Sequence, residues 1–190
     1  MESDKVKERI VRCSIVGDSF VGKTTLIKQF LGEESTDGPI PTQLQIIKLI
    51  LISCLCFFSI GNIHTADGFY TVSIFDTTGQ HDMDGLRHFP YAQSDTIIVC
   101  YSVIDRTSFN NVLQVWIPEI KKYTLKGTHI VLVATHCDRI DIKSAAAIRS
   151  EGISLAKKIG AFRFVEASKY DFETMSKLFE AIVMKIVKRE

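Results

Sequence analysis

Lys23 and Thr24 end a short glycine-containing segment whose spacing suits the binding of nucleotide phosphates. Residues 17–24 read GDSFVGKT and fit the pattern G-x-x-x-x-G-K-[ST]. In such a loop the glycines let the backbone close around the phosphates, the lysine reaches the β- and γ-phosphates, and the hydroxyl ligates Mg²⁺. An ordinary glycine turn is the alternative, and the strand-like and helix-like segments on either side disfavour it. The predicted phosphate site comprises Gly17, Asp18, Ser19, Phe20, Val21, Gly22, Lys23, Thr24 and Thr25.

A second loop carries groups that suit metal binding and hydrolysis. Asp76 directly follows an alternating segment at 69–75 that reads as a strand closing a hairpin. An aspartate at such a strand tip holds Mg²⁺ in phosphate-loop proteins, and the N–H of Gly79 can meet a γ-phosphate. Gln80 follows that glycine and is placed to orient an attacking water.

Two later loops suit a guanine base. Asp138, in the segment Thr135-His136-Cys137-Asp138, can accept hydrogen bonds from the N1–H and 2-amino groups of guanine, which adenine does not offer as a pair. Backbone N–H groups at Ser168 and Lys169 can meet the guanine O6. Each of these two signals alone is more often a helix cap or a turn, but together with the phosphate loop they indicate a guanine nucleotide.

Alternating strands and helices must position these loops. Buried or alternating apolar runs predict strands at 10–16, 69–75, 96–101, 129–134 and 162–167. Helical spacing of apolar residues follows at 25–31, 108–123, 143–159 and 174–187. This order predicts a three-layer α/β sheet whose ligands lie at the carboxyl ends of the strands.

The composition is that of one ordinary globular domain of 190 residues, with 46% apolar and 24% charged residues. A net charge of +1 argues against a broad nucleic-acid surface. The charged N-terminus lacks an apolar signal core, and the five scattered cysteines predict reduced thiols, so a cytoplasmic location is expected.

The chain resembles the Rho/Rac branch of the Ras superfamily of small GTPases. The resemblance is carried by 17–24, 76–80, Asp82 with Leu86-Arg87, 108–112, the sequence WIPEI at 116–120, and 155–161. It implies one GTPase domain over 1–190, with a mostly parallel six-stranded sheet and helices on both faces. It also implies GTP or GDP with Mg²⁺, Lys23 and Gln80 as catalytic residues, and Thr24, Thr42 and Asp76 as metal ligands.

The same resemblance implies a monomer that works with effector proteins such as kinases or cytoskeletal regulators, with exchange factors and with GTPase-activating proteins. No cysteine follows Cys137, so no prenylation site is expected, and membrane contact would be peripheral and through partners. Trp116 is expected to pack a helix and not to recognise the nucleotide.

Several departures from the family pattern predict altered kinetics. Ser19 stands where the family has glycine, and Thr78 where it has alanine, so slow hydrolysis is expected. Ser35 replaces an aromatic residue against the base and His136 replaces a lysine, so fast exchange and a mostly GTP-bound protein are expected. The alternative is a GTP-loaded scaffold with negligible hydrolysis. A nucleotide kinase fits poorly, since no arginine-rich lid is visible.

An apolar insertion at 43–58 follows Thr42 and includes most of an uncharged run from Leu49 to Ile60. A membrane span needs about 20 apolar residues, so this run is too short. An edge strand with surplus loop, an interfacial or partner-binding segment, and an artefact of the gene sequence remain open. The interval from Thr135 to Ser168 is shorter than in typical Rho proteins, so their extra helix is expected to be missing.

Overall fold

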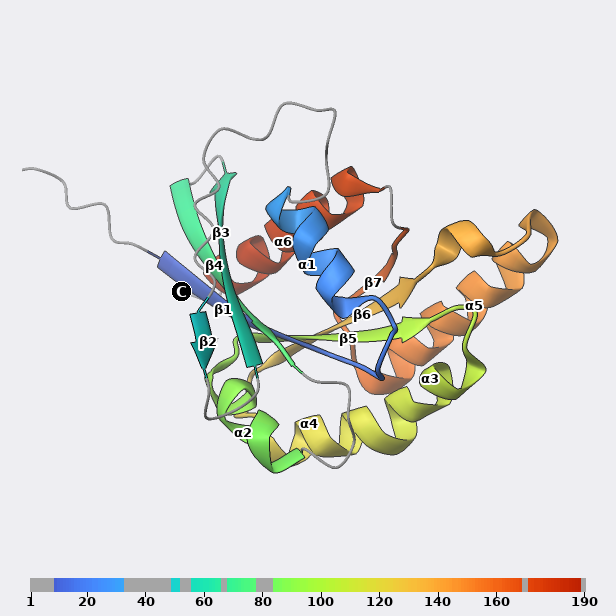
Figure 1. Ribbon diagram of the computed structural model, residues 1–190, viewed down its shortest axis with the longest axis horizontal. Helices are drawn as coiled ribbons and strands as arrows, with labels where there is room; N and C mark the ends of the chain where they lie inside the picture. The colour runs from blue at the N-terminus through green and yellow to red at the C-terminus, as the bar shows by residue number, and fades with distance from the viewer. Residues whose placement is uncertain are drawn as a thin grey trace, which may run out of the picture.

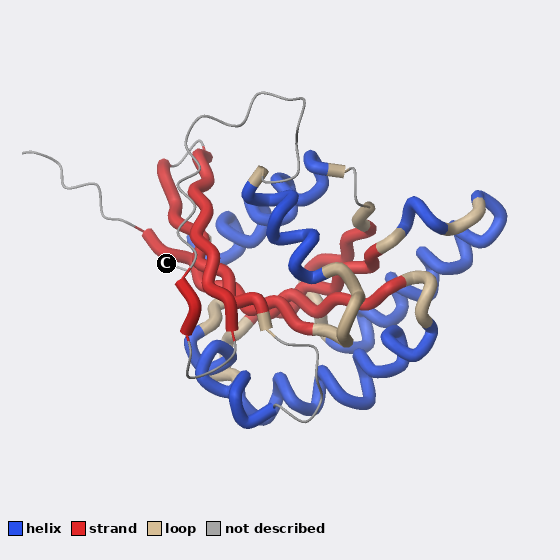
Figure 2. Tube along the Cα trace, viewed as in Figure 1, coloured by secondary structure: helices blue, strands red, loops and turns tan. Residues whose placement is uncertain are grey.

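The computed structural model describes residues 9–32, 49–51, 56–65, 68–77, 84–168 and 171–188. Its centre is a seven-stranded sheet in the order β2-β3-β4-β1-β5-β6-β7 (Figures 1 and 2). The strands are β1 (Arg9–Val16), β2 (Leu49–Leu51), β3 (Cys56–Thr65), β4 (Gly68–Asp76), β5 (Thr96–Ser102), β6 (His129–Thr135) and β7 (Arg163–Glu166). The five strands from β4 to β7 in this order run parallel, whereas β2 and β3 are antiparallel to their neighbours.

Helices cover both faces of the sheet (Figure 1). One face carries α1 (Lys23–Leu31) and α6 (Phe172–Val187), and the other carries α2 (Asp84–Gln93), α3 (Arg106–Asn111), α4 (Ile117–Tyr123) and α5 (Ile142–Ile159). A π-helical turn, η2 (Val112–Trp116), joins α3 to α4, and a short 3₁₀ turn, η3 (Cys137–Arg139), follows β6. No helix in the described ranges is long and apolar enough to span a membrane.

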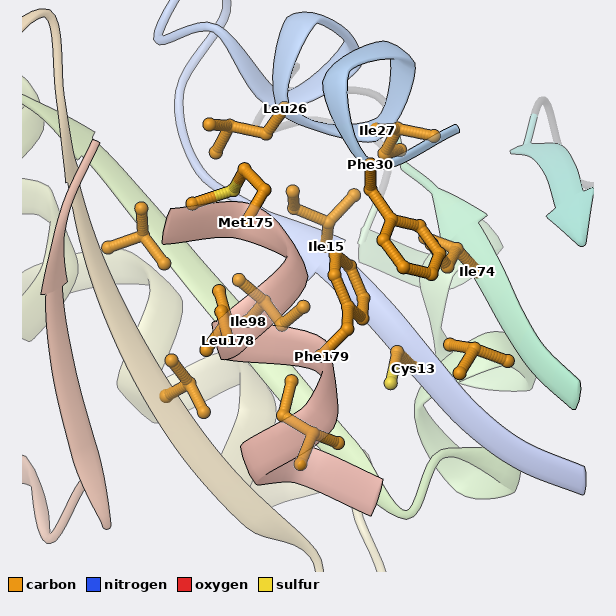
Figure 3. Packing of buried hydrophobic residues seen from close by; sticks show 14 of the residues in the cluster. Cys13, Ile15, Leu26, Ile27, Phe30, Ile74, Ile98, Met175, Leu178 and Phe179 are labelled. Atoms are coloured by element: carbon orange, nitrogen blue, oxygen red, sulfur yellow. The ribbon is translucent and has the colours of Figure 1, made fainter. Parts of the chain in front are cut away.

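The two faces of the sheet bury separate apolar cores because side chains alternate along each strand. In β5, Ile98 faces the core under α1 and α6, while Ile97 and Val99 face the core on the opposite side. Figure 3 shows the first core, where Phe30 of α1 stacks on Phe179 of α6 with ring centroids 3.9 Å apart. These cores fix the strand ends from which the candidate site loops leave.

The three-layer α/β prediction is confirmed, with three differences in detail. The sheet has the six expected strands and a seventh, β2, from the apolar insertion. β3 supplies the first strand of the hairpin that β4 was expected to close. The helix predicted at 108–123 is interrupted by η2, and α2 was not predicted.

Part of the insertion at 43–58 lies in strands. Residues 49–51 form β2 and residues 56–58 begin β3, with Phe57 in register with Asp76, while the rest of the insertion lies outside the described residues. Between β6 and β7, a span that the structure describes completely, η3 and α5 are the only helices. The extra helix of typical Rho proteins is therefore absent from that span, as expected.

Candidate nucleotide-binding site

The predicted phosphate loop connects β1 to α1 and depends on two glycines. Gly17 has a φ of 143°, and a Cβ atom there would lie only 2.2 Å from the carbonyl oxygen of Cys100 in β5. Gly22 is the N-cap of α1 with a φ of 91°, in the left-handed region that favours glycine. The loop therefore packs directly on the sheet and presents the N-terminal end of α1, which attracts anions.

Lys23 folds back across this loop. Its Nζ donates hydrogen bonds to the carbonyl oxygens of Gly17 at 2.8 Å and of Asp18 at 2.7 Å. The side chain is buried, and this burial lowers the pKa of its ammonium group. The positive charge is thus held at the centre of the loop, where an anion would regain the favourable interaction that burial removes.

Thr24 and Asp76 come together from α1 and β4. The Thr24 hydroxyl donates to Asp76 Oδ2 at 2.6 Å. Burial raises the pKa of the Asp76 carboxyl, and the Thr24 hydrogen bond and the Lys23 charge partly oppose this rise. A buried carboxylate next to a hydroxyl and close to a phosphate loop is a donor set that fits Mg²⁺, which prefers oxygen ligands.

The described residues do not build a metal cage at this place. The described residues contain no group of three His, Cys, Asp or Glu side chains that could hold a metal ion. Mg²⁺ is usually held by one or two protein oxygens together with waters and phosphate oxygens, and the pair of Thr24 and Asp76 suits that mode. Thr42, the third predicted ligand, lies outside the described residues.

Thr135 and His136 connect the base end of the site to the phosphate loop. The Thr135 hydroxyl lies 2.7 Å from the carbonyl oxygen of Val21 and 3.0 Å from that of Tyr101. His136 has a φ of 59°, and its Nδ1 lies 2.8 Å from the Ser102 hydroxyl oxygen. Thr135 therefore contacts the backbone of the phosphate loop directly, and the hydrogen bond to Ser102 fixes the His136 ring at the end of β5.

Asp138 and Ser168 line one open cavity of about 630 Å³. The two loops are tied together, because the Cys137 N–H donates to the Ala167 carbonyl oxygen at 3.2 Å. Burial raises the pKa of the Cys137 thiol to about 11, which leaves it a neutral lining group. The remaining lining residues are Ile140, Ile142, Ala145, Ala146, Arg149, Glu166 and Asp171.

Two residues of the predicted phosphate site expose their side chains. Ser19 and Phe20 lie at the outer surface of the loop, and Phe20 is 98% exposed. Phe20 also has a φ of 65°, which is strained for a bulky residue. Strain of this kind is found mainly at functional sites.

The structure brings most of the predicted site residues to one end of the sheet. Those it describes are 17–25, Asp76, Thr135, Asp138 and Ser168. The predicted residues outside the described part are Ser35, Thr42, Thr78, Gly79, Gln80 and Lys169.

Asn111 and Trp116 are contacts of the site that the sequence did not reveal. Asn111 Nδ2 donates to Asp18 Oδ2 at 2.6 Å, and Trp116 Nε1 donates to Asp18 Oδ1 at 2.7 Å. Trp116 is fully buried, as expected, but a buried indole N–H needs a partner, and this requirement was the available signal.

Comparisons with known proteins agree with this geometry. The Ras family profile matches residues 12–188. The chain is 32% identical over 182 residues to the Ras-like GTP-binding protein RhoL of Drosophila melanogaster, which covers 95% of this chain and 89% of that protein. It is also 32% identical over 183 residues to the Rho-related protein racL of Dictyostelium discoideum, and this alignment covers 91% of this chain and 87% of that protein. The phosphate loop, the parallel sheet and these similarities together show that the chain belongs to the Ras family of small GTPases, as a Rho/Rac-like member.

Proposed function

We propose that the protein is a Rho-type switch that binds GTP and GDP with Mg²⁺, hydrolyses GTP slowly and is mostly GTP-bound. The observation that carries this proposal is the 2.6 Å contact between Thr24 and Asp76 beside the buried ammonium group of Lys23. It combines oxygen ligands for a divalent cation with a positive charge for the phosphates.

Each residue has a separate role in the proposed reaction. The loop 17–25 and Lys23 hold the phosphates, while Thr24, Thr42 and Asp76 hold the Mg²⁺, which neutralises charge that develops on the leaving phosphate. Gln80 orients the attacking water and Gly79 contacts the γ-phosphate. Thr135, Asp138, Ser168 and Lys169 bind the guanosine end of the nucleotide.

Ser19 and Thr78 are the reason for expecting slow hydrolysis. The Ser19 side chain is exposed on the phosphate loop, where it would enter the space used by Gln80 and by the arginine of an activating protein. Phosphate binding through the backbone of the loop would be retained. Ser35 and His136 would weaken the hold on the base, so rapid exchange against the more abundant GTP would keep the protein loaded.

A second candidate is a GTP-loaded scaffold with negligible hydrolysis. Ser19 and Thr78 favour it, and the retained Gln80 favours the switch. In either role we propose effectors, exchange factors and GTPase-activating proteins as partners, in signal transduction that acts on kinases or the actin cytoskeleton. We propose a monomer in the cytoplasm that reaches membranes through partners.

The nucleotide content of freshly purified protein, followed by single-turnover phosphate release with Mg²⁺, tests both candidates. Mostly GTP with slow but measurable release supports the switch, and release indistinguishable from the uncatalysed rate supports the scaffold. The variant Ser19→Gly should release phosphate faster than the parent. Mostly GDP at purification with ordinary release would refute the GTP-loaded state, and absence of any guanine nucleotide would refute both candidates.

A further inference from the structure

Asp18 places a carboxylate inside a loop that is proposed to bind a polyphosphate. A negative charge next to phosphates would oppose binding unless it is turned away and compensated. Both carboxylate oxygens in fact accept hydrogen bonds from side chains on the face of the sheet opposite α1. Oδ2 accepts from Asn111 at 2.6 Å and Oδ1 accepts from Trp116 at 2.7 Å. The backbone carbonyl of Asp18 meanwhile accepts from Lys23 Nζ at 2.7 Å. Asp18 therefore joins the loop lysine to the helices on the opposite face of the sheet.

The π-helical turn explains how two residues of one helix reach the same carboxylate. In an α-helix, residues five positions apart, such as Asn111 and Trp116, would point about 140° away from each other. In η2 the N–H of Ile117 bonds to the carbonyl of Val112, a spacing of five that widens the turn. The wider turn brings residues five apart to nearly the same side. Such turns are frequent at functional sites.

The indole of Trp116 is held on its other side as well. The guanidinium of Arg87 in α2 lies over the indole, with its carbon 5.1 Å from the ring centroid. Arg87 is itself fixed by two hydrogen bonds to Glu119 at 2.7 and 2.8 Å. The buried indole is thus held between the Asp18 carboxylate and the Arg87 guanidinium.

We propose that Asn111 and Trp116 are positioning residues that hold the phosphate loop in its nucleotide-binding shape by fixing the Asp18 carboxylate. We call Asp18, Asn111 and Trp116 the Asp18 clamp. The clamp keeps the carboxylate behind the loop, so that the loop N–H groups and Lys23 face the phosphates. This inference rests on the proposed guanine nucleotide binding and adds residues that do not themselves touch the nucleotide.

The test is the rate at which GDP with Mg²⁺ leaves the loaded protein. Trp116→Phe keeps the aromatic ring and removes the N–H, and it should speed release about tenfold, because a hydrogen bond to a charged group is lost. Asn111→Ala removes the other donor from a half-buried position and should act in the same direction. The neighbouring Asn110 has an exposed side chain, so Asn110→Ala is the matched control and should leave release unchanged.

A double-mutant cycle separates positioning from packing. If Trp116 acts through Asp18, Trp116→Phe should have little further effect on release in an Asp18→Ala background. An equal acceleration in both backgrounds would mean that the ring only packs, and would overturn the proposal. So would parent-like release from both Trp116→Phe and Asn111→Ala. If Trp116→Phe does not fold, Asn111→Ala and its cycle with Asp18→Ala decide. A parent protein that retains no guanine nucleotide would instead refute the proposed function and this inference together.

Discussion

Replacing Glu119 by glutamine should destabilise the protein strongly, because it leaves a buried arginine without its counter-ion. Arg87 is fully buried, Glu119 nearly so, and two parallel hydrogen bonds of 2.7 and 2.8 Å join them. Tyr91 also donates to Glu119 Oε1 at 2.7 Å. Burial alone would lower the pKa of Arg87, but the hydrogen bonds and charge of Glu119 reverse this and raise it. When the carboxylate is removed, the guanidinium still keeps its charge, because arginine is not deprotonated in proteins even when it is buried.

The size of the loss follows from this burial. Removing one partner of a buried ion pair costs about 3–5 kcal/mol in the free energy of unfolding. For a domain of this size, each kcal/mol lowers Tm by about 2–4 °C, so Glu119→Gln should lower Tm by roughly 6–20 °C. The measurement is thermal unfolding of nucleotide-free protein by calorimetry. The combined replacement of Arg87→Met, Tyr91→Phe and Glu119→Leu should recover most of the loss, because it removes both buried charges together with the Tyr91 hydroxyl that donates to Glu119.

An exposed pair of the same residue types supplies the control. Arg106 and Glu151 form an ion pair whose side chains are 65% and 48% exposed. Glu151→Gln should therefore cost less than about 1 kcal/mol. If Glu119→Gln were no more harmful than Glu151→Gln, the reasoning from buried charge would be refuted.

Substitutions at three further positions test other features. Burial raises the pKa of Asp76 in the folded, nucleotide-free protein, so the free energy of unfolding should fall as the pH rises from the ordinary carboxyl pKa to the raised one, and stay at the lower value above it. Asp76→Asn removes this ionisation and should raise and flatten that pH profile. The same variant should lose the stabilisation of about 2.7 kcal/mol that a Mg²⁺–nucleotide complex gives at 100 times its Kd, and an undiminished gain on titration would contradict the metal role. Phe20→Asn should raise the free energy of unfolding by about 1 kcal/mol in denaturant titrations, because asparagine tolerates the φ of 65° and the 98% exposed ring gives up no packing. Phe20→Ala keeps the backbone strain and should raise the free energy of unfolding less. Gly152→Ala should lower the free energy of unfolding by about 1 kcal/mol, although alanine has the better helix propensity. The added Cβ would lie 2.4 Å from the ring of Phe164 and 2.7 Å from the Tyr101 hydroxyl. A more stable variant would show that these rings move aside easily.

The sequence predicted the parts of the site that depend on short contiguous patterns. Residues 17–24 carry their glycines, lysine and threonine in one segment, so the loop and its flanking strand and helix were accessible. Asp76, Asp138 and Ser168 follow clear strands, and their meeting at one sheet edge follows from parallel topology.

Other features depend on distant contacts or on atypical local sequence. In the Asp18 clamp, Asn111 and Trp116 lie 93 and 98 positions after Asp18 in the sequence. The π turn that orients these two side chains interrupts an ordinary helical pattern. Helix α2 contains Gly85 and Pro90, which lower its intrinsic helix propensity, so tertiary packing decides it. In β3, Gly61 faces the ring of Phe30, where a Cβ would lie 2.6 Å from a ring carbon, and this glycine weakens the strand pattern in the sequence.

The Asp18 clamp also has a spectroscopic consequence. Trp116 is the single tryptophan of the chain, so all indole emission arises from one fully buried ring. Its N–H is bonded to the phosphate loop and a guanidinium lies over its face. Indole emission responds to nearby charge and hydrogen bonding, so excitation beyond the tyrosine band gives the unlabelled protein its own optical probe of the phosphate loop. Loading and release could then be followed in real time without a modified nucleotide.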